Sequence, residues 1–221
     1  MAPQMDLERA RFNMVEQQIR TWEVLDQRVL DLLFKVPRED FVPELYRALA
    51  FVDMEIPIGN GEKMLQPKQE ARMLQELMLK QQDHILEVGT GSGYMTALLA
   101  SFAAHVYSVD IHPDFTRNAA GKLAMHGISN VTLETGDAAL GWNKQGPYDA
   151  ILITGSLPIL PETFKMSLKP GGRLLAVIGE PPVMEAQLIT NVGGGAYNAV
   201  SLFETCIAPL KNARQPERFV F

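Results

Sequence analysis

The fold is decided by residues 84–94, which read His84-Ile85-Leu86-Glu87-Val88-Gly89-Thr90-Gly91-Ser92-Gly93-Tyr94. The first five residues form a short, largely apolar run that predicts a buried strand. Three glycines at alternate positions follow it, and the segment from Tyr94 predicts a helix. Glycine lets the backbone bend sharply and approach a ligand closely, because it has no Cβ. A helix start also offers free N–H groups. The stretch therefore predicts a ligand-binding loop between a strand and a helix.

Downstream of this loop, apolar strands alternate with helices. Strands are predicted at residues 105–109, 131–134, 148–153 and 173–178, and helices at residues 94–102, 116–126 and 161–168. The three glycines at 193–195 separate two further strands, 186–192 and 196–206, which predict an antiparallel hairpin. The alternation indicates an α/β fold with a doubly wound, mostly parallel, Rossmann-like sheet.

The region before the loop has a mainly helical pattern, without the alternation of strands and helices. Residues 9–20 have apolar side chains at helical spacing, Asp26 is expected to cap a second helix, and Gln66-Pro67 to start a third. The stretch Ile56 to Gly61 is predicted to be a loop from its Pro, Gly and Asn content. We therefore expect a helical cap with a substrate loop at 1–80, a sheet domain at 81–210 and a tail at 211–221.

Composition excludes several classes of protein. The 221 residues are 47% hydrophobic and 21% charged, which rules out a disordered chain. The net charge of −6 argues against general binding to nucleic acid. The single cysteine, Cys206, excludes an internal disulfide and fits a reducing compartment. Neither a signal peptide nor a run of about 18 apolar residues is found, so we expect a cytoplasmic protein without a membrane partner. The scattered histidines give no metal-site spacing.

The glycine spacing discriminates between cofactors. A dinucleotide loop has the pattern G-x-G-x-x-G, which would place glycine at Tyr94. The pattern here is G-x-G-x-G with Glu87 two residues before the first glycine, which is typical of nucleoside methyltransferases. S-adenosylmethionine carries a sulfonium, an ammonium and a ribose diol, and these groups favour carboxylates nearby. The loop therefore favours S-adenosylmethionine over a nicotinamide dinucleotide.

Three carboxylates lie at the carboxyl ends of successive strands. Glu87 is expected to add negative potential near the ammonium end, directly or by holding the loop. Asp110 is expected to accept both ribose hydroxyls, and Asp137 to accept from the adenine amino group. Each has a plainer interpretation: Glu87 as a cap partner, Asp110 as a strand terminator, Asp137 in an Asx turn. Their register with one glycine loop favours the cofactor site.

The sequence resembles the protein-L-isoaspartate O-methyltransferases from about Gln17 to Leu210. The similarity rests on the segments 36–43 (VPREDFVP), 56–61 (IPIGNG), 66–67 (QP), 87–94 (EVGTGSGY), 148–154 (YDAILIT) and 168–180. The resemblance implies methylation of the misplaced carboxylate of isoaspartyl residues in damaged proteins, with a protein or peptide as substrate. It also implies a seven-stranded sheet whose last strand is antiparallel, and a C-terminal segment that helps to cover the substrate.

One departure from the family pattern concerns the acceptor side. The family has Thr-Ile-Ser before Gln-Pro, and its serine touches the substrate carboxylate; this chain has Lys63-Met64-Leu65. A leucine cannot donate a hydrogen bond to a carboxylate. The reaction tolerates this, because the carboxylate is ionised near pH 7 and needs no general base. Ser156 could supply a donor from the opposite wall, although a turn-capping serine is the more common case.

The predicted site has two sides. The acceptor side comprises Leu65, Gln66 and Ser156, with Gly155 beside them. The cofactor side comprises Met64, Glu87, Gly89, Thr90, Gly91, Ser92, Gly93, Tyr94, Asp110, Ile111, Asp137, Ala138 and Thr154. Two alternatives stay open: a methyltransferase of the same fold with a different, less polar or small acceptor, and a non-catalytic S-adenosylmethionine-binding module that reports to a partner. The Phe219-Val220-Phe221 tail is expected to dock on the body of the protein or on a partner. A nicotinamide oxidoreductase is disfavoured by Tyr94.

Overall fold

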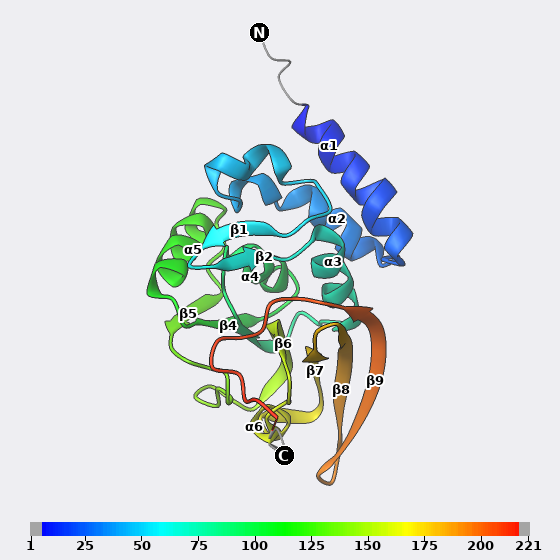
Figure 1. Cartoon of the computed structure of the whole chain (residues 1–221), viewed down its shortest axis with the longest axis vertical. Helices are drawn as coiled ribbons and strands as arrows, with labels where there is room; N and C mark the ends of the chain where they lie inside the picture. Colours follow the sequence, from blue (N-terminus) through cyan, green and yellow to red (C-terminus); the bar gives the residue numbers. More distant parts are fainter. Residues whose placement is uncertain (1–5, 217–221) are drawn as a thin grey trace, which may run out of the picture.

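A computed structural model of the chain describes residues 6–216 (Figure 1). Within these residues, one sheet has seven strands in the order β5-β4-β3-β6-β7-β8-β9, and a separate hairpin consists of β1 and β2. The strands are β1 (Ile56–Gly59), β2 (Glu62–Met64), β3 (His84–Val88), β4 (His105–Asp110), β5 (Val131–Thr135), β6 (Tyr148–Leu157), β7 (Leu168–Glu180), β8 (Val183–Gly193) and β9 (Ala196–Thr205).

The sheet is parallel in its centre and antiparallel at one side. β3 pairs in parallel with β4 and with β6, β4 with β5, and β6 with β7. β8 is antiparallel to both β7 and β9, which confirms the expected antiparallel pairing of the last strand. The chain order reverses at β3, so the carboxyl ends of β3, β4 and β6 meet at a switch point, where open α/β sheets bind ligands.

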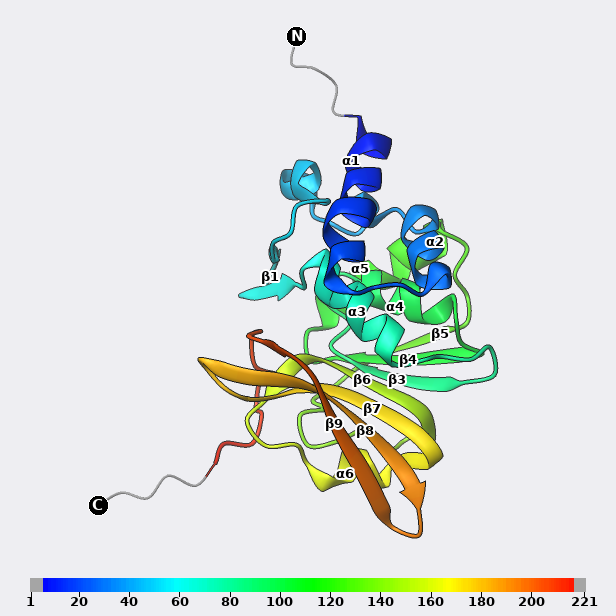
Figure 2. The same cartoon turned by 90° about the vertical axis from the view of Figure 1, so that its right-hand side faces the viewer.

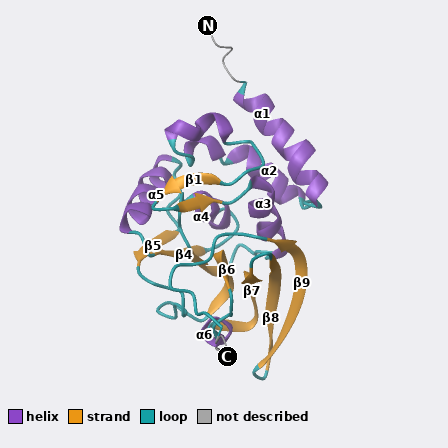
Figure 3. Ribbon diagram, viewed as in Figure 1, coloured by secondary structure: helices purple, strands orange, loops and turns teal. Residues whose placement is uncertain are grey.

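Helices cover the two faces of the sheet unequally. α3 (Pro67–Glu76), α4 (Tyr94–Ala100) and α5 (Pro113–Met125) lie on the face that also carries the N-terminal helices, whereas the short α6 (Glu162–Met166) lies on the other (Figures 2 and 3). One hydrophobic cluster joins the cap to the sheet, since Leu74 of α3 packs in it with Leu98 of α4 and Val106 of β4. The cap and the sheet domain therefore share a core.

The prediction of a regular first helix is wrong. The chain forms α1 (Leu7–Asn13), a π-helical turn (Met14–Ile19) and a 3₁₀ turn (Arg20–Trp22) in place of one α-helix over 9–20. The N–H of Arg20 bonds to the carbonyl of Val15, five residues earlier. This wider turn buries Met14, Val15 and Ile19 together.

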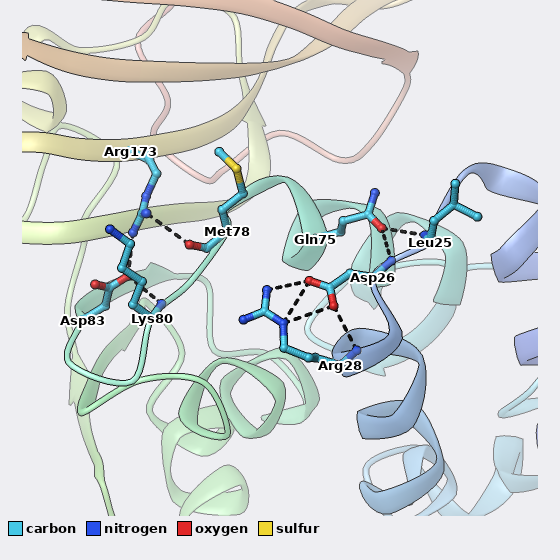
Figure 4. A network of polar contacts seen from close by, with 8 residues as sticks. All are labelled: Leu25, Asp26, Arg28, Gln75, Met78, Lys80, Asp83 and Arg173. Carbon is cyan, nitrogen blue, oxygen red and sulfur yellow. Dashed lines mark hydrogen bonds and ion pairs between the residues drawn. The ribbon is translucent and has the colours of Figure 1, made fainter.

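Asp26 caps α2 (Gln27–Lys35) as predicted, since its Oδ1 accepts from the N–H of Arg28 at 2.9 Å. Figure 4 shows the surrounding network. Gln75 of α3 accepts from the N–H groups of Leu25 and Asp26 at 2.7 and 2.9 Å, which fixes the start of α2 against α3.

The same network continues to the sheet. Arg173 of β7 bonds to the carboxylate of Asp83 at 2.5 Å and to the carbonyl of Met78 at 3.1 Å (Figure 4). The segment that enters β3 is thus held to β7. This contact crosses the predicted boundary at residue 80, which itself stays a prediction.

The stretch from Ile56 to Gly61 is not the loop that its composition suggested. It forms β1 and the turn of a hairpin, with Ile56 paired to Met64 and Pro57 to Lys63. Asn60 and Gly61 both have positive φ, 54° and 79°, which is the conformation of a type I′ turn. The Asn-Gly pair is a strong hairpin signal, and the composition argument overlooked it.

Candidate active site

A cavity lies at the carboxyl ends of β3, β4 and β6, between the β1–β2 hairpin and the chain after β9. Figure 1 shows this last segment crossing in front of the sheet. The residues around the cavity are Glu55, Ile58, Glu62, Lys63, Leu65, Val88, Gly89, Gly91, Val109, Asp110, Ile111, His112, Phe115, Gly136, Asp137, Ala138, Ala139, Thr154, Gly155, Ala208, Pro209, Leu210 and Lys211. The glycine loop and two of the three predicted carboxylates are therefore brought together.

The glycine loop is held in a conformation that other residues adopt with strain. Gly89 and Gly91 have φ of 98° and 49°. A Cβ on Gly89 would stand only 2.2 Å from Oγ1 of Thr154. That hydroxyl lies 2.9 Å from the carbonyl oxygens of both Val88 and Gly89, to which it donates its one hydrogen. The loop is thus pinned to β6, and its backbone forms a wall of the cavity.

Asp110 ends β4 and orders the loop. Its Oδ2 accepts from the N–H of Gly91 and its Oδ1 from the N–H of His112, both at 2.9 Å. Burial raises the pKa of Asp110, while these two N–H groups oppose the rise. Each carboxylate oxygen keeps a further lone pair. The carboxylate is therefore oriented on the cavity wall and can still accept from a diol.

Asp137 also lies on the cavity wall, but both of its oxygens have partners. Oδ1 accepts from the N–H of Ala139 at 3.0 Å, and Oδ2 accepts from Nδ2 of Asn212 at 2.8 Å. The first contact is the Asx turn of the plainer interpretation. The second ties the chain after β9 to the end of β5, on the same side as Ala138.

Glu87 does not line the cavity. It is fully buried, and its Oε2 accepts from Thr96 of α4 at 2.5 Å and from Ser108 of β4 at 2.6 Å. Ser108 in turn lies 2.6 Å from the hydroxyl of Thr90 in the glycine loop. Burial raises the pKa of Glu87 to about 8, so the side chain is largely neutral at pH 7. Of its two expected roles, the contacts of Glu87 favour holding the loop, and a direct contribution to the potential near the ammonium end stays a prediction.

Ser156 does not face the acceptor side. Its side chain is fully buried, and its hydroxyl donates to the carbonyl of Ile207 at 3.1 Å. Its main-chain N–H and carbonyl bond to Ala208 and Leu210. The role of Ser156 as a substitute donor for the acceptor is therefore contradicted. It instead fastens the chain after β9 to β6, so that Ala208, Pro209 and Leu210 cover the cavity.

Several further residues of the predicted site do not line the cavity. Tyr94 is buried in the core, with the guanidinium of Arg38 5.4 Å from the centre of its ring. The residues of the predicted site that do not line the cavity are Met64, Gln66, Glu87, Thr90, Ser92, Gly93, Tyr94 and Ser156. Those that do are Leu65, Gly89, Gly91, Asp110, Ile111, Asp137, Ala138, Thr154 and Gly155.

Leu65 is held on the wall by a residue for which sequence reasoning gave no role. Arg38 is 1% exposed, and its Nη2 donates to the carbonyl of Leu65 at 2.6 Å. It also donates to the carbonyl of Ala50 at 2.8 Å and to the buried carboxylate of Glu70 at 3.1 Å. Burial raises the pKa of Glu70 to about 7, and Arg38 opposes the rise. The arginine in the 36–43 motif thus organises the acceptor side.

The other missed residues close the cavity. Nζ of Lys211 lies 3.1 Å from Oε1 of Glu62 and donates to the carbonyl of Asn60 at 3.1 Å. Nε2 of His112 faces the same Glu62 oxygen at 3.8 Å. The hairpin and the chain after β9 therefore meet across the cavity. No local signal in the sequence marks the distant partners of Lys211.

Between residues 6 and 216, histidine, cysteine, aspartate and glutamate side chains form no group of three or more that could hold a metal ion. None of the helices described is long and apolar enough to span a membrane. The Phe219-Val220-Phe221 tail lies outside the described residues.

Comparison with known sequences identifies relatives over nearly the whole chain. The model of the family described as protein-L-isoaspartate(D-aspartate) O-methyltransferase (PCMT) matches residues 9–212. A protein-L-isoaspartate O-methyltransferase of Methanoculleus marisnigri is 38% identical over 202 residues, which cover 91% of each chain. One from Rhodopseudomonas palustris is 39% identical over 208 residues, which cover 92% of this chain and 95% of the relative.

Comparison with solved structures supports the fold. A Plasmodium falciparum structure described as a protein-L-isoaspartate O-methyltransferase, in complex with S-adenosyl-L-homocysteine, superposes with a TM-score of 0.78 and 22% identity. The match covers 90% of this chain and 97% of the other. At this identity the similarity establishes the shared fold.

Proposed function

This chain belongs to the protein-L-isoaspartate(D-aspartate) O-methyltransferase family, and from that premise we propose how its cavity serves the reaction. The chain is an S-adenosylmethionine-dependent O-methyltransferase that acts on isoaspartyl residues of protein substrates. The observation that carries the site assignment is Asp110, which two backbone N–H groups orient on the cavity wall beside the glycine loop.

The residues present fit S-adenosylmethionine. Gly89 and Gly91 present bare backbone on the cavity wall, where a Cβ would meet Thr154 or Ile58, and Asp110 has lone pairs free for the ribose diol. Ile111, Phe115 and Ala138 supply apolar surface for the adenine. When bound, the cofactor supplies an electrophilic sulfonium methyl group. These residues would hold it. The site needs no phosphate-binding group, because S-adenosylmethionine carries no phosphate.

The chain need not supply a base. An isoaspartyl carboxylate is ionised at neutral pH and carries its own nucleophilic oxygen. Leu65 and Gly155, with Pro209 and Leu210 of the covering segment, offer a largely apolar wall that removes water from that oxygen. The hydrogen bond from Arg38 to the carbonyl of Leu65 keeps this wall in place. The protein therefore contributes the positioning and the desolvation of the substrate carboxylate.

The test is methyl transfer from labelled S-adenosylmethionine to an isoaspartyl peptide, with the matched aspartyl peptide as control. We expect selective labelling of the isoaspartyl peptide and loss of most cofactor affinity in Asp110→Ala. Asp31→Ala is a matched control, since Asp31 is exposed on α2 and lies outside the cavity wall. Equal labelling of both peptides, or of neither, would contradict the assignment.

One observation favours a second candidate, a same-fold methyltransferase for a less polar acceptor. Leu65 is apolar, and the hydroxyls of Thr154 and Ser156 are engaged with backbone carbonyls. Cofactor binding without peptide labelling would support that candidate or the binding module. The cytoplasmic location and the lack of a nucleic-acid partner stay predictions from composition.

A further inference from the structure

We propose that the ammonium group of Lys63 binds the carboxylate of the acceptor residue. This inference rests on the proposed function and specifies how a charged acceptor is recognised in a cavity whose wall is apolar at Leu65. It concerns a residue that lies on the cavity wall and that the cofactor assignment does not use.

Few side chains around the cavity can donate a hydrogen bond to a carboxylate. Around the cavity, the described residues whose side chains carry N–H or O–H groups are Lys63, His112, Thr154 and Lys211. Thr154 uses its single hydrogen on the backbone carbonyls of β3 and the glycine loop. A carboxylate in the cavity therefore has only the other three side chains from which to accept.

Two of these three donors, Lys211 and His112, lie together beside Glu62. Lys211 and His112 face the same Glu62 oxygen, at 3.1 and 3.8 Å. His112 follows Asp110 by two residues and donates its main-chain N–H to it, so this group lies on the side assigned to the ribose. Lys63 alone pairs outside that group, with Glu55; it is the middle residue of β2, next to Glu62 and two positions before Leu65.

The ammonium of Lys63 has the capacity and the freedom for a second carboxylate. It donates to Oε2 of Glu55 at 2.9 Å, which uses one of its three hydrogens. The Lys63 side chain is 51% exposed, and ion pairs of such exposure are held weakly. Glu55 raises the pKa of Lys63, so the ammonium stays charged at neutral pH.

Glu55 is then part of the same recognition. It lies on the cavity wall with Lys63 and cancels its charge when no substrate is bound. A substrate carboxylate approaching Lys63 also meets the negative charge of Glu55. Removing that charge while keeping the side chain's shape should therefore strengthen binding of the acceptor, and removing Lys63 should weaken it.

The experiment measures KM and kcat for the isoaspartyl peptide, together with the Kd of S-adenosylhomocysteine. In Lys63→Met we expect KM to rise about two- to fivefold, as for loss of a partly exposed ion pair, with the cofactor Kd unchanged. Lys63→Arg should recover most of the affinity, and Glu55→Gln should lower KM. Lys144→Met is the matched control, because Lys144 is 57% exposed, lies 3.0 Å from Glu134 and does not line the cavity. The KM of this variant should equal that of the wild type.

The outcomes separate this inference from the function on which it rests. If the wild-type chain methylates the peptide and the Lys63→Met variant has the same KM, the role of Lys63 is overturned and the proposed function stands. A Lys63→Met variant that loses cofactor affinity in proportion to its KM overturns it also, since Lys63 would then act on the cofactor. Failure of the wild-type chain to methylate any isoaspartyl peptide overturns the proposed function and this inference together.

Discussion

The guanidinium of Arg38 and the main-chain carbonyl of Leu65 are joined by a hydrogen bond of 2.6 Å. The arginine comes from the cap, before the hairpin, and the leucine forms part of the cavity wall. Both residues are buried, and Glu70 of α3 supplies the countercharge. The conformation of the acceptor wall therefore depends on a residue 27 positions away in the sequence.

Arg38→Lys tests this dependence. Lysine keeps the charge but cannot reach Leu65, Ala50 and Glu70 at once, because it lacks the planar fork of arginine. We expect the free energy of unfolding to fall by about 2–4 kcal/mol, since buried groups lose their partners. Urea denaturation measures this loss, and kcat/KM for the peptide should fall about tenfold with it. Arg47→Lys is the control, because Arg47 is 43% exposed and lies 2.9 Å from Asp40; a loss of equal size there would contradict the argument.

Local signals in the sequence predicted the centre of the fold and its loop. The strand at 84–88 and the glycines at 89–93 depend on neighbours in the chain, and the structure has β3 at the predicted bounds. Asp110 ends its strand beside the loop for the same reason. What failed depends on distant partners: Ser156 bonds to Ile207, 51 residues away, and Lys211 to Asn60, 151 residues away. No periodicity of the sequence records such contacts.

Gly89→Ala should damage the cofactor site through Thr154. The new Cβ would stand 2.2 Å from Oγ1 of Thr154, and φ of 98° is strained for alanine. We expect the Kd of S-adenosylhomocysteine to rise at least about thirtyfold, by calorimetry, because the loop must move away from β6. Gly193→Ala, in the β8–β9 turn, measures the cost of the strain alone on the free energy of unfolding, since Gly193 has φ of 89° with no atom within 4 Å of its Cβ. The double variant Gly89→Ala, Thr154→Ala should recover part of the affinity; no recovery would exclude the contact as the cause.

Glu87→Gln should change the pH dependence of stability. Burial raises the pKa of Glu87 from 4.5 to about 8, so the folded chain binds a proton that the unfolded chain releases between these values. The free energy of unfolding therefore falls as the pH rises from about 4.5 to 8. Glutamine keeps an oxygen for Thr96 and Ser108 but cannot ionise. The variant should be more stable than the wild type at pH 9, by a few kcal/mol in order of magnitude, and closer to it at pH 5. Urea denaturation at both pH values checks this, and equal pH slopes in the two proteins would refute it.

Lys211→Met should speed the release of the cofactor product. Nζ of Lys211 joins the chain after β9 to the hairpin through Glu62 and the carbonyl of Asn60, each at 3.1 Å, and these contacts hold the two segments together beside the cavity. Lys211 is 44% exposed, and a contact of this kind contributes roughly 0.5–1 kcal/mol, so we expect release of S-adenosylhomocysteine to be about two- to fivefold faster. Stopped-flow displacement measures that rate. Glu62→Gln should have a similar effect, and the double variant less than the product of the two, because both remove one contact. Independent effects of the two substitutions would mean that Lys211 and Glu62 do not hold the cover closed together.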